Sequence, residues 1–277
     1  TLLALGVQPL AAGGEPFARV RLALEQEQEA LARELLESGL KDRVLEPAWR
    51  DEGLVLALRA RAWTLAARLL SEGARVRAPV AAGPTALSLA ASDGGPWMQE
   101  LFLSMGATDS TGAALEVLLG RGEGEAVRRL LREGRVPPDI AFARLSASPA
   151  SHALLREWSL RSWKALSREN QEALLRLAVG RDDDALAIFL MEQAGLDARL
   201  QDEAGRTLLH LAAGQAGPKL VEYLVSRGVP LDAEAPRCVR ALDLARERGD
   251  REGSRVARLL EEQGATAGGC AGPATGE

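Results

Sequence analysis

Residues Asp202-Glu203-Ala204-Gly205-Arg206-Thr207-Leu208-Leu209-His210-Leu211-Ala212-Ala213 decide the fold of this chain. Charged and small residues around Gly205 predict a turn, and the apolar residues that follow it recur at the spacing of one helix face. After a Gly217-Pro218 break, which ends one helix and starts another, the segment 220–226 carries a second apolar face. A helix pair this short cannot bury its apolar faces alone, so it must stack on neighbouring pairs.

The same two-helix pattern recurs along the chain. Segments of the form xxLLxxG end at a series of closing glycines, which are Gly39, Gly73, Gly106, Gly134, Gly195, Gly228 and Gly264. Their gaps are 34, 33, 28, 61, 33 and 36 residues, and the long gap divides near Leu160, where 153–158 repeats the second-helix pattern without its glycine. Glycine commonly closes a helix because it adopts the left-handed conformation without a Cβ penalty. The spacing therefore predicts about eight helix pairs.

The stretch 202–213 resembles the ankyrin signature D-x-x-G-x-T-P-L-H-x-A-A, with Leu208 in the place of the proline. The segment 83–91 keeps the same register after its own closing glycine, and Ser88 stands where the family has histidine. The last unit, 241–265, resembles a C-terminal ankyrin cap. On these residues the chain is identified as a divergent member of the ankyrin-repeat family.

The resemblance assigns structural roles to a small set of motif residues. In ankyrin repeats the threonine and histidine that match Thr207 and His210 tie the hairpin to the helix and to the next repeat by hydrogen bonds. Gly205, Gly83 and Thr85 are the other matching motif residues. We therefore expect His210 to be a buried, hydrogen-bonded residue and not a ligand or a nucleophile.

The resemblance, strongest over 74–106 and 196–266, implies a mainly α fold: an ankyrin-type α-solenoid of stacked helix-turn-helix repeats with short β-hairpin fingers, some truncated. Residues 1–16 are expected to be an apolar N-terminal leader or a first helix, residues 17–266 the solenoid, and residues 267–277 a flexible Gly/Ala tail. The solenoid is irregular at 107–171, because the connector after Gly106 is about five residues short and prolines interrupt 135–171. An alternative is two ankyrin blocks that flank an aberrant helical spacer.

Composition excludes several classes of function. Hydrophobic residues make up 47% of the chain but aromatic residues only 4%, which favours close helix packing through Ala, Leu and Val. A formal charge of -5 without a basic stripe predicts no nucleic-acid partner. The sequence lacks an apolar run of 18 residues, so we expect no membrane insertion. The use of Arg in place of Lys, with much Ala and Gly, indicates a GC-rich, bacterial source.

The compartment depends on how the first residues are interpreted. Residues 1–14 are apolar and small and could be the end of a signal sequence, but the basic start that such a sequence requires is not seen. We expect a cytoplasmic protein, with a periplasmic or secreted location as the alternative. The two cysteines, Cys238 and Cys270, give no basis for a disulfide framework or a zinc site.

No catalytic, metal or cofactor site is predicted. The only other histidine, His152, lies far from His210 in the repeat order, so a metal centre or a Ser-His-Asp triad would have to span distant units. The glycine-rich stretch 120–125 lacks the lysine of a phosphate loop, and Asp182-Asp183-Asp184 lacks the spacing of a calcium loop. Both are expected to be turns between helices.

The resemblance instead implies a monomeric scaffold or inhibitor that binds a protein partner of unknown identity through its concave surface. By register, the expected contact residues lie at hairpin tips and exposed turns: Glu203, Arg206, Gln215, Ser92, Asp93, Arg237, Glu247 and Arg248. Trp49, in a finger-like connector, is either an exposed anchor or a packing residue, whereas Trp63 and Trp97 are expected to pack. Two alternatives stay open: an exported, host-directed effector that acts by binding, and an enzyme with an unrecognised site in 135–171.

Overall fold

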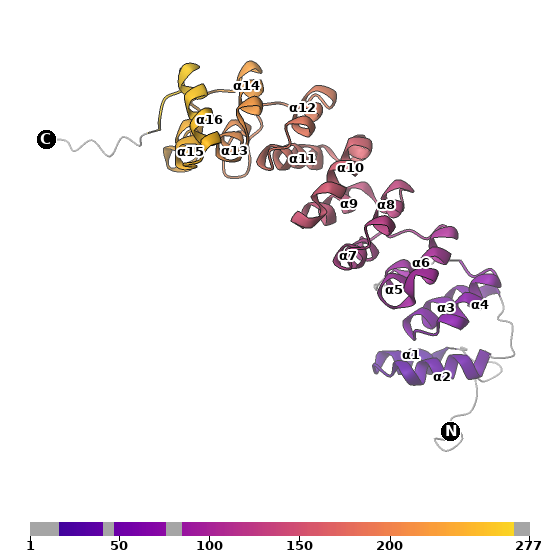
Figure 1. Cartoon of the computed structure of the whole chain (residues 1–277). Coiled ribbons are helices and arrows are strands. Elements are labelled where there is room, and N and C mark those ends of the chain that lie inside the picture. Colours follow the sequence, from indigo (N-terminus) through magenta and orange to yellow (C-terminus); the bar gives the residue numbers. More distant parts are fainter. Residues whose placement is uncertain (1–16, 41–46, 76–84, 269–277) are drawn as a thin grey trace. The chain divides into compact units, whose positions relative to one another are not determined.

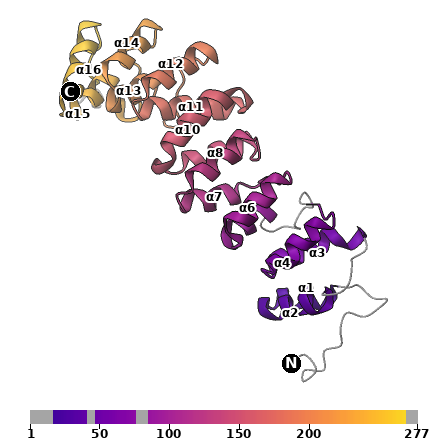
Figure 2. The same cartoon turned by 45° about the vertical axis from the view of Figure 1, so that its right-hand side comes forward.

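The computed structural model describes residues 17–40, 47–75 and 85–268. The expected leader 1–16, the motif residue Gly83 and nearly all of the tail lie outside these ranges. Two compact units are distinguished, residues 1–158 and 159–277, and the boundary between them falls within helix α10. Figures 1 and 2 show that both units consist of short helices joined by turns.

The first unit contains the helices up to the start of α10. They are α1 (Ala18–Glu25), α2 (Glu29–Leu40), α3 (Pro47–Arg59), α4 (Trp63–Ser71), α5 (Ala86–Leu89), the π-helical η2 (Ala90–Gly94), α6 (Gly95–Ser104), α7 (Ala113–Gly120), α8 (Gly124–Arg132), α9 (Pro138–Ser146), the 3-10 turn η3 (Pro149–Ser151) and α10 (His152–Ser162). Helix α10 thus extends four residues into the second unit.

The second unit continues with the 3-10 turn η4 (Trp163–Ala165), α11 (Arg168–Gly180), α12 (Asp184–Gln193), α13 (Leu208–Gln215), α14 (Pro218–Ser226), the 3-10 turn η5 (Pro236–Cys238), α15 (Ala241–Glu247) and α16 (Arg251–Glu262). Pro218 opens α14 at a position where a helix needs no backbone donor. The predicted break at Gly217-Pro218 is therefore the boundary between α13 and α14.

Helices of successive pairs stack in ranks. In the first unit α1, α3, α5, α7 and α9 contact one another in chain order; in the second unit α11, α13 and α15 form one rank and α12, α14 and α16 another. Figures 1 and 2 both show the two rows of the second unit. Between the rows, fully buried residues such as Leu209, Ala212 and Leu220 make up the core. The prediction of a mainly α solenoid of stacked helix pairs is confirmed.

Most of the closing glycines adopt the expected left-handed conformation. Their φ values are +96° at Gly73, +83° at Gly106, +63° at Gly134, +58° at Gly195, +76° at Gly228 and +91° at Gly264. Gly39 is the exception, because α2 continues through it to Leu40. A left-handed residue also occurs in several turns inside pairs, and three of these turns use Glu27, Arg61 and Asp182 instead of glycine.

The hairpin fingers are minimal. In the second unit they consist of single antiparallel bridges, Gln201 with Thr207 and Ala235 with Val239. Residues 107–171, all of which the structure describes, contain no bridge. There the buried Asp109 joins neighbouring connectors by hydrogen bonds. Its N–H donates to the Arg135 carbonyl at 2.7 Å, and its carboxylate accepts from the Leu115 N–H at 2.8 Å.

Candidate protein-binding surface

The finger at 201–207 is organised by Asp202. Its Oδ1 accepts from the N–H groups of Ala204 at 2.9 Å and Arg206 at 2.8 Å, and Gly205 turns the chain with a φ of +73°. Partial burial alone would raise the pKa of Asp202, but hydrogen bonds from the Arg206 backbone and side chain lower it below its ordinary value. The carboxylate stays charged, and Glu203 is displayed at the exposed tip.

His210 joins this finger to the next one. Thr207 caps α13, and its N–H donates to His210 Nδ1 at 3.1 Å, so that the other ring nitrogen, Nε2, donates to the Val239 carbonyl at 3.2 Å. The side chain of His210 is 1% exposed, and this burial lowers its pKa. The ring is therefore neutral, and the contacts link a finger, its helix and the following repeat.

Thr85 begins α5 in a similar way, although serine replaces the histidine. The Ser88 N–H donates to Thr85 Oγ1 at 3.1 Å, and Ser88 Oγ donates to the Thr85 carbonyl at 2.8 Å. The Ser88 side chain is too short to reach the next repeat, and its hydroxyl donates within its own repeat instead. The link to the next repeat that His210 makes therefore has no counterpart at Ser88.

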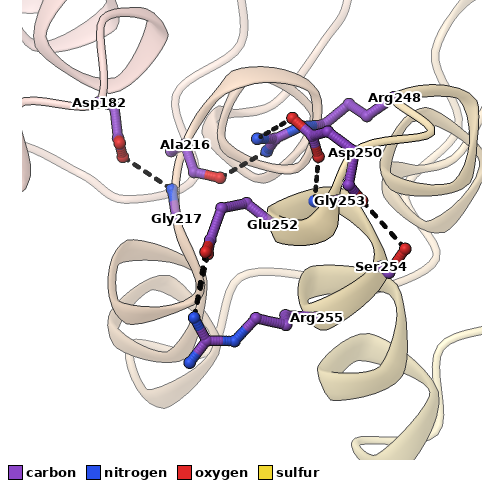
Figure 3. Close-up of polar contacts among 9 residues, drawn as sticks. All are labelled: Asp182, Ala216, Gly217, Arg248, Asp250, Glu252, Gly253, Ser254 and Arg255. Carbon is purple, nitrogen blue, oxygen red and sulfur yellow. Dashed lines mark hydrogen bonds and ion pairs between the residues drawn. The ribbon is translucent and has the colours of Figure 1, made fainter.

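The turns between paired helices in the second unit are tied across repeats (Figure 3). Asp182 Oδ1 accepts from the Gly217 N–H at 2.7 Å, and the Arg248 guanidinium donates to the Ala216 carbonyl at 2.6 Å while it contacts the Asp250 carboxylate at 3.0 Å. A hydrogen bond from the Gly253 N–H, followed by that from Arg248, lowers the pKa of Asp250. Three successive turns are thereby held by side chains that reach backbone atoms.

The comparison with known families agrees with this geometry. A sequence model described as ankyrin repeat matches residues 204–233, the segment that runs from the Asp202 finger through α13 and α14. The chain therefore contains a segment that matches an ankyrin repeat. No curated protein matches the sequence of this chain.

Among solved structures, this chain is similar to a chain in the complex of the Bd0816 predatory endopeptidase from Bdellovibrio bacteriovorus with immunity protein Bd3460. The two chains are 18% identical with a TM-score of 0.44, over 64% of this chain and 97% of the other.

The expected contact residues fall into two groups. Some side chains are committed to the scaffold: Arg206 pairs with Asp202 at 2.8 Å, Asp93 lies 3.5 Å from Arg61, Ser92 Oγ donates to the Ser88 carbonyl, and the Arg248 side chain is only 14% exposed. Others are displayed: Glu203, Gln215, Arg237 and Glu247 are exposed. Arg237 stands on the second finger with a φ of +66°.

The structure corrects the expected location of Trp49 and the expected packing of Trp97. Trp49 is not in a connector but in the first turn of α3, where its ring packs edge-on against the buried Phe17 with 6.3 Å between ring centres. Trp97 was expected to pack, yet it is 54% exposed at the start of α6. Burial could not be inferred for either, because one tryptophan on a short helix does not reveal which neighbour covers it.

The remaining candidate chemistry is sparse. Among the residues that the structure describes, no group of three His, Cys, Asp or Glu side chains is placed to hold a metal ion, and no helix is long and apolar enough to cross a membrane. Ser151 is buried and His152 is half-buried. Cys238, for which a disulfide was not anticipated, is disulfide-bonded; the other cysteine of the sequence, Cys270, lies outside the described ranges.

Proposed function

We propose that this chain is a protein-protein interaction scaffold or inhibitor, without enzymatic activity, whose second unit binds a protein partner. We define the fingertip surface as the exposed residues Glu203, Arg206, Gln215, Arg237 and Glu247, since the Arg206 side chain stays 50% exposed although it pairs with Asp202. One observation carries the proposal: charged side chains are displayed on turns whose backbone is fixed from beneath by Asp202, His210 and Arg248.

Such an arrangement suits recognition of a folded partner. Side chains on a rigid backbone lose less conformational freedom on binding than side chains on a mobile loop, so more of the contact energy appears as affinity. The displayed charges are of both signs, and charge steering of this kind weakens with added salt. We therefore propose a salt-sensitive association, in which Arg248 acts as a positioning residue beneath the surface.

Two of the expected contact residues lie in the first unit, apart from this surface. Asp93 and Ser92 lie on a π-helical turn beside Arg61 and Arg121, and both are already engaged within the chain. We retain them as peripheral contact residues, and we remove Trp49 because it packs on Phe17. We further propose that the chain acts as a monomer, which light scattering at 29.4 kDa would test. Cell fractionation would separate the cytoplasmic location from an exported effector.

The test is affinity purification of the intact protein from its source, followed by mass spectrometry and reconstitution with the purified partner. Glu203→Arg and Arg237→Glu should each weaken the reconstituted complex by about tenfold, the effect of about 1.4 kcal/mol at a charged contact. Matched controls are Glu222→Arg on α14 and Arg258→Glu on α16, both exposed residues of the same unit on second helices.

The two pairs of variants should unfold at the same temperature as the original chain. Equal weakening of the complex by the fingertip variants and by the control variants would show that binding depends on net charge or on another face. Hydrogen exchange on the reconstituted complex locates the binding surface independently. Protection is expected at residues 201–207 and 234–240 and not along α14.

A further inference from the structure

The second helices α6 and α8 of the first unit leave an open groove between them. It has a volume of about 710 Å³ and is lined by residues of α6, of α8 and of their flanks, and not by residues of the first helices α5 and α7. The corresponding helices of the second unit, α12 with α14 and α14 with α16, pack against each other. The groove lies at the junction with the shortened connector, where Gly106 and Gly134 are 28 residues apart.

The lining of the α6–α8 groove is acidic. Its charged members are Glu100, Glu123, Glu125, Arg129, Arg132 and Glu133. Arg129 contacts both Glu133, at 2.9 Å, and Glu100, and Glu133 also contacts Arg135 at 3.1 Å, while Arg132 is exposed. Glu125 contacts Arg128 at 2.6 Å but keeps 88% of its side chain exposed, and Glu123 reaches Arg121 only at 4.0 Å. The groove therefore offers negative charge to a cationic group.

Gln99 supplies an independent indication of a ligand. It lines the groove and is only 6% exposed, yet its Nε2 has no hydrogen-bond partner within the described residues. A buried amide that lacks a partner is unfavourable, so such groups are rare unless an outside partner completes them. A carbonyl oxygen placed in the groove beside Gln99 would satisfy this donor.

Trp97 extends the same surface. On α6 it lies on the helix face next to that of Pro96 and Glu100, which line the groove, and its side chain is 54% exposed. A tryptophan face attracts Lys and Arg side chains through the charge distribution of its ring. An exposed tryptophan that lies one helical turn from Glu100 is thus suited to a cationic side chain at the margin of the groove.

We propose that the α6–α8 groove is a second interaction surface, which binds an Arg- or Lys-bearing peptide segment of a protein partner. The peptide carbonyl accepts from Gln99, and its cationic side chains lie among Glu123, Glu125 and Trp97. A peptide supplies both the acceptor and the positive charge, whereas a metal ion supplies no acceptor for the amide. This site is separate from the fingertip surface and does not depend on it.

The test uses the full chain and a short fluorescein-labelled peptide of repeating Arg-Gly-Ser, with a repeating Glu-Gly-Ser peptide as the charge control, followed by fluorescence anisotropy. The arginine peptide should bind and the glutamate peptide should not. Gln99→Leu and Trp97→Ala should each weaken binding by about fivefold or more, as expected for the loss of one good contact. The thermal midpoint of Gln99→Leu should be unchanged or raised, because an unpaired buried amide is removed.

A matched pair of double variants distinguishes peptide binding in the groove from general attraction of a basic peptide to an acidic chain. Glu123→Gln with Glu125→Gln should weaken binding, whereas Glu222→Gln with Glu262→Gln, exposed acids of the second unit with the same change of charge, should not. Equal weakening by both double variants overturns the proposal. The proposal is also overturned if Gln99→Leu lowers the thermal midpoint and leaves the affinity for the arginine peptide unchanged. Glu203→Arg, on the fingertip surface, should leave peptide binding unchanged.

Discussion

The neutral, buried state of His210 makes folding stability depend on pH in a narrow window. Burial lowers the pKa of this residue below 6.5 in the folded chain, whereas the unfolded chain keeps the ordinary value. Below pH 6.5 the unfolded chain therefore binds a proton that the folded chain does not. The stability contributed by the neutral ring is complete above that pH, and it is lost as the pH falls toward the folded-state pKa.

The magnitude follows from proton linkage. A difference of one bound proton changes the free energy of unfolding by about 1.4 kcal/mol per pH unit. The structural reason is that a proton on Nδ1 turns the acceptor of the Thr207 N–H bond into a donor. Carboxylates with lowered pKa, such as Asp202 and Asp250, remain ionised in this window and do not contribute to the slope.

Urea unfolding followed by circular dichroism, from about pH 8 down to about pH 5, measures this slope. His210→Gln should be less stable by about 1 to 3 kcal/mol at neutral pH, because it disrupts the contacts of Thr207 and Val239. It should also lose most of the slope below pH 6.5, whereas Leu209→Ala, which is destabilised but retains His210, should keep it. Identical slopes in the original chain and in His210→Gln would refute a neutral His210.

Two further predictions concern the scaffold. Leu209→Ala, at a fully buried position of α13, should cost about 2 to 5 kcal/mol in the free energy of unfolding measured by urea titration. Glu27→Gly should raise that free energy by up to about 1 kcal/mol, because Glu27 has a φ of +57° in the turn between α1 and α2. The control Glu34→Gly, in the middle of α2, should lower it by about 1 kcal/mol, and a loss of stability in both variants would contradict the left-handed turn.

The repeat was predictable because the glycines that end its helices are favoured by local backbone conformation. A left-handed helix end favours glycine whatever lies around it, so the spacing from Gly73 onward fixed the helix pairs without any knowledge of packing. Gly39 shows the limit of this reasoning, since a glycine that matches the spacing can still continue a helix. The turns at Arg61 and Asp182 show the converse, because tertiary contacts hold non-glycine residues in the same conformation.

The candidate site was less accessible to sequence reasoning. Register alone located Arg237 and Arg248 in a finger and a turn, but it could not reveal that Arg248 reaches the Ala216 carbonyl of the preceding repeat. Gln99 gave no sequence signal, because its burial arises from the way two successive repeats meet. Trp97 was likewise misassigned, because its place on a short second helix does not determine whether a neighbour covers it. These contacts span about one repeat length, which no local pattern encodes.

The residues that hold the backbone of the fingers and turns differ from those displayed on them, and this difference has an evolutionary consequence. Asp202, His210 and Arg248 hold the backbone, while Glu203, Arg237 and Glu247 take no part in holding it. Changes at the displayed positions can therefore accumulate without a penalty in folding, and descendants of this chain can acquire new partners while the same frame is inherited intact.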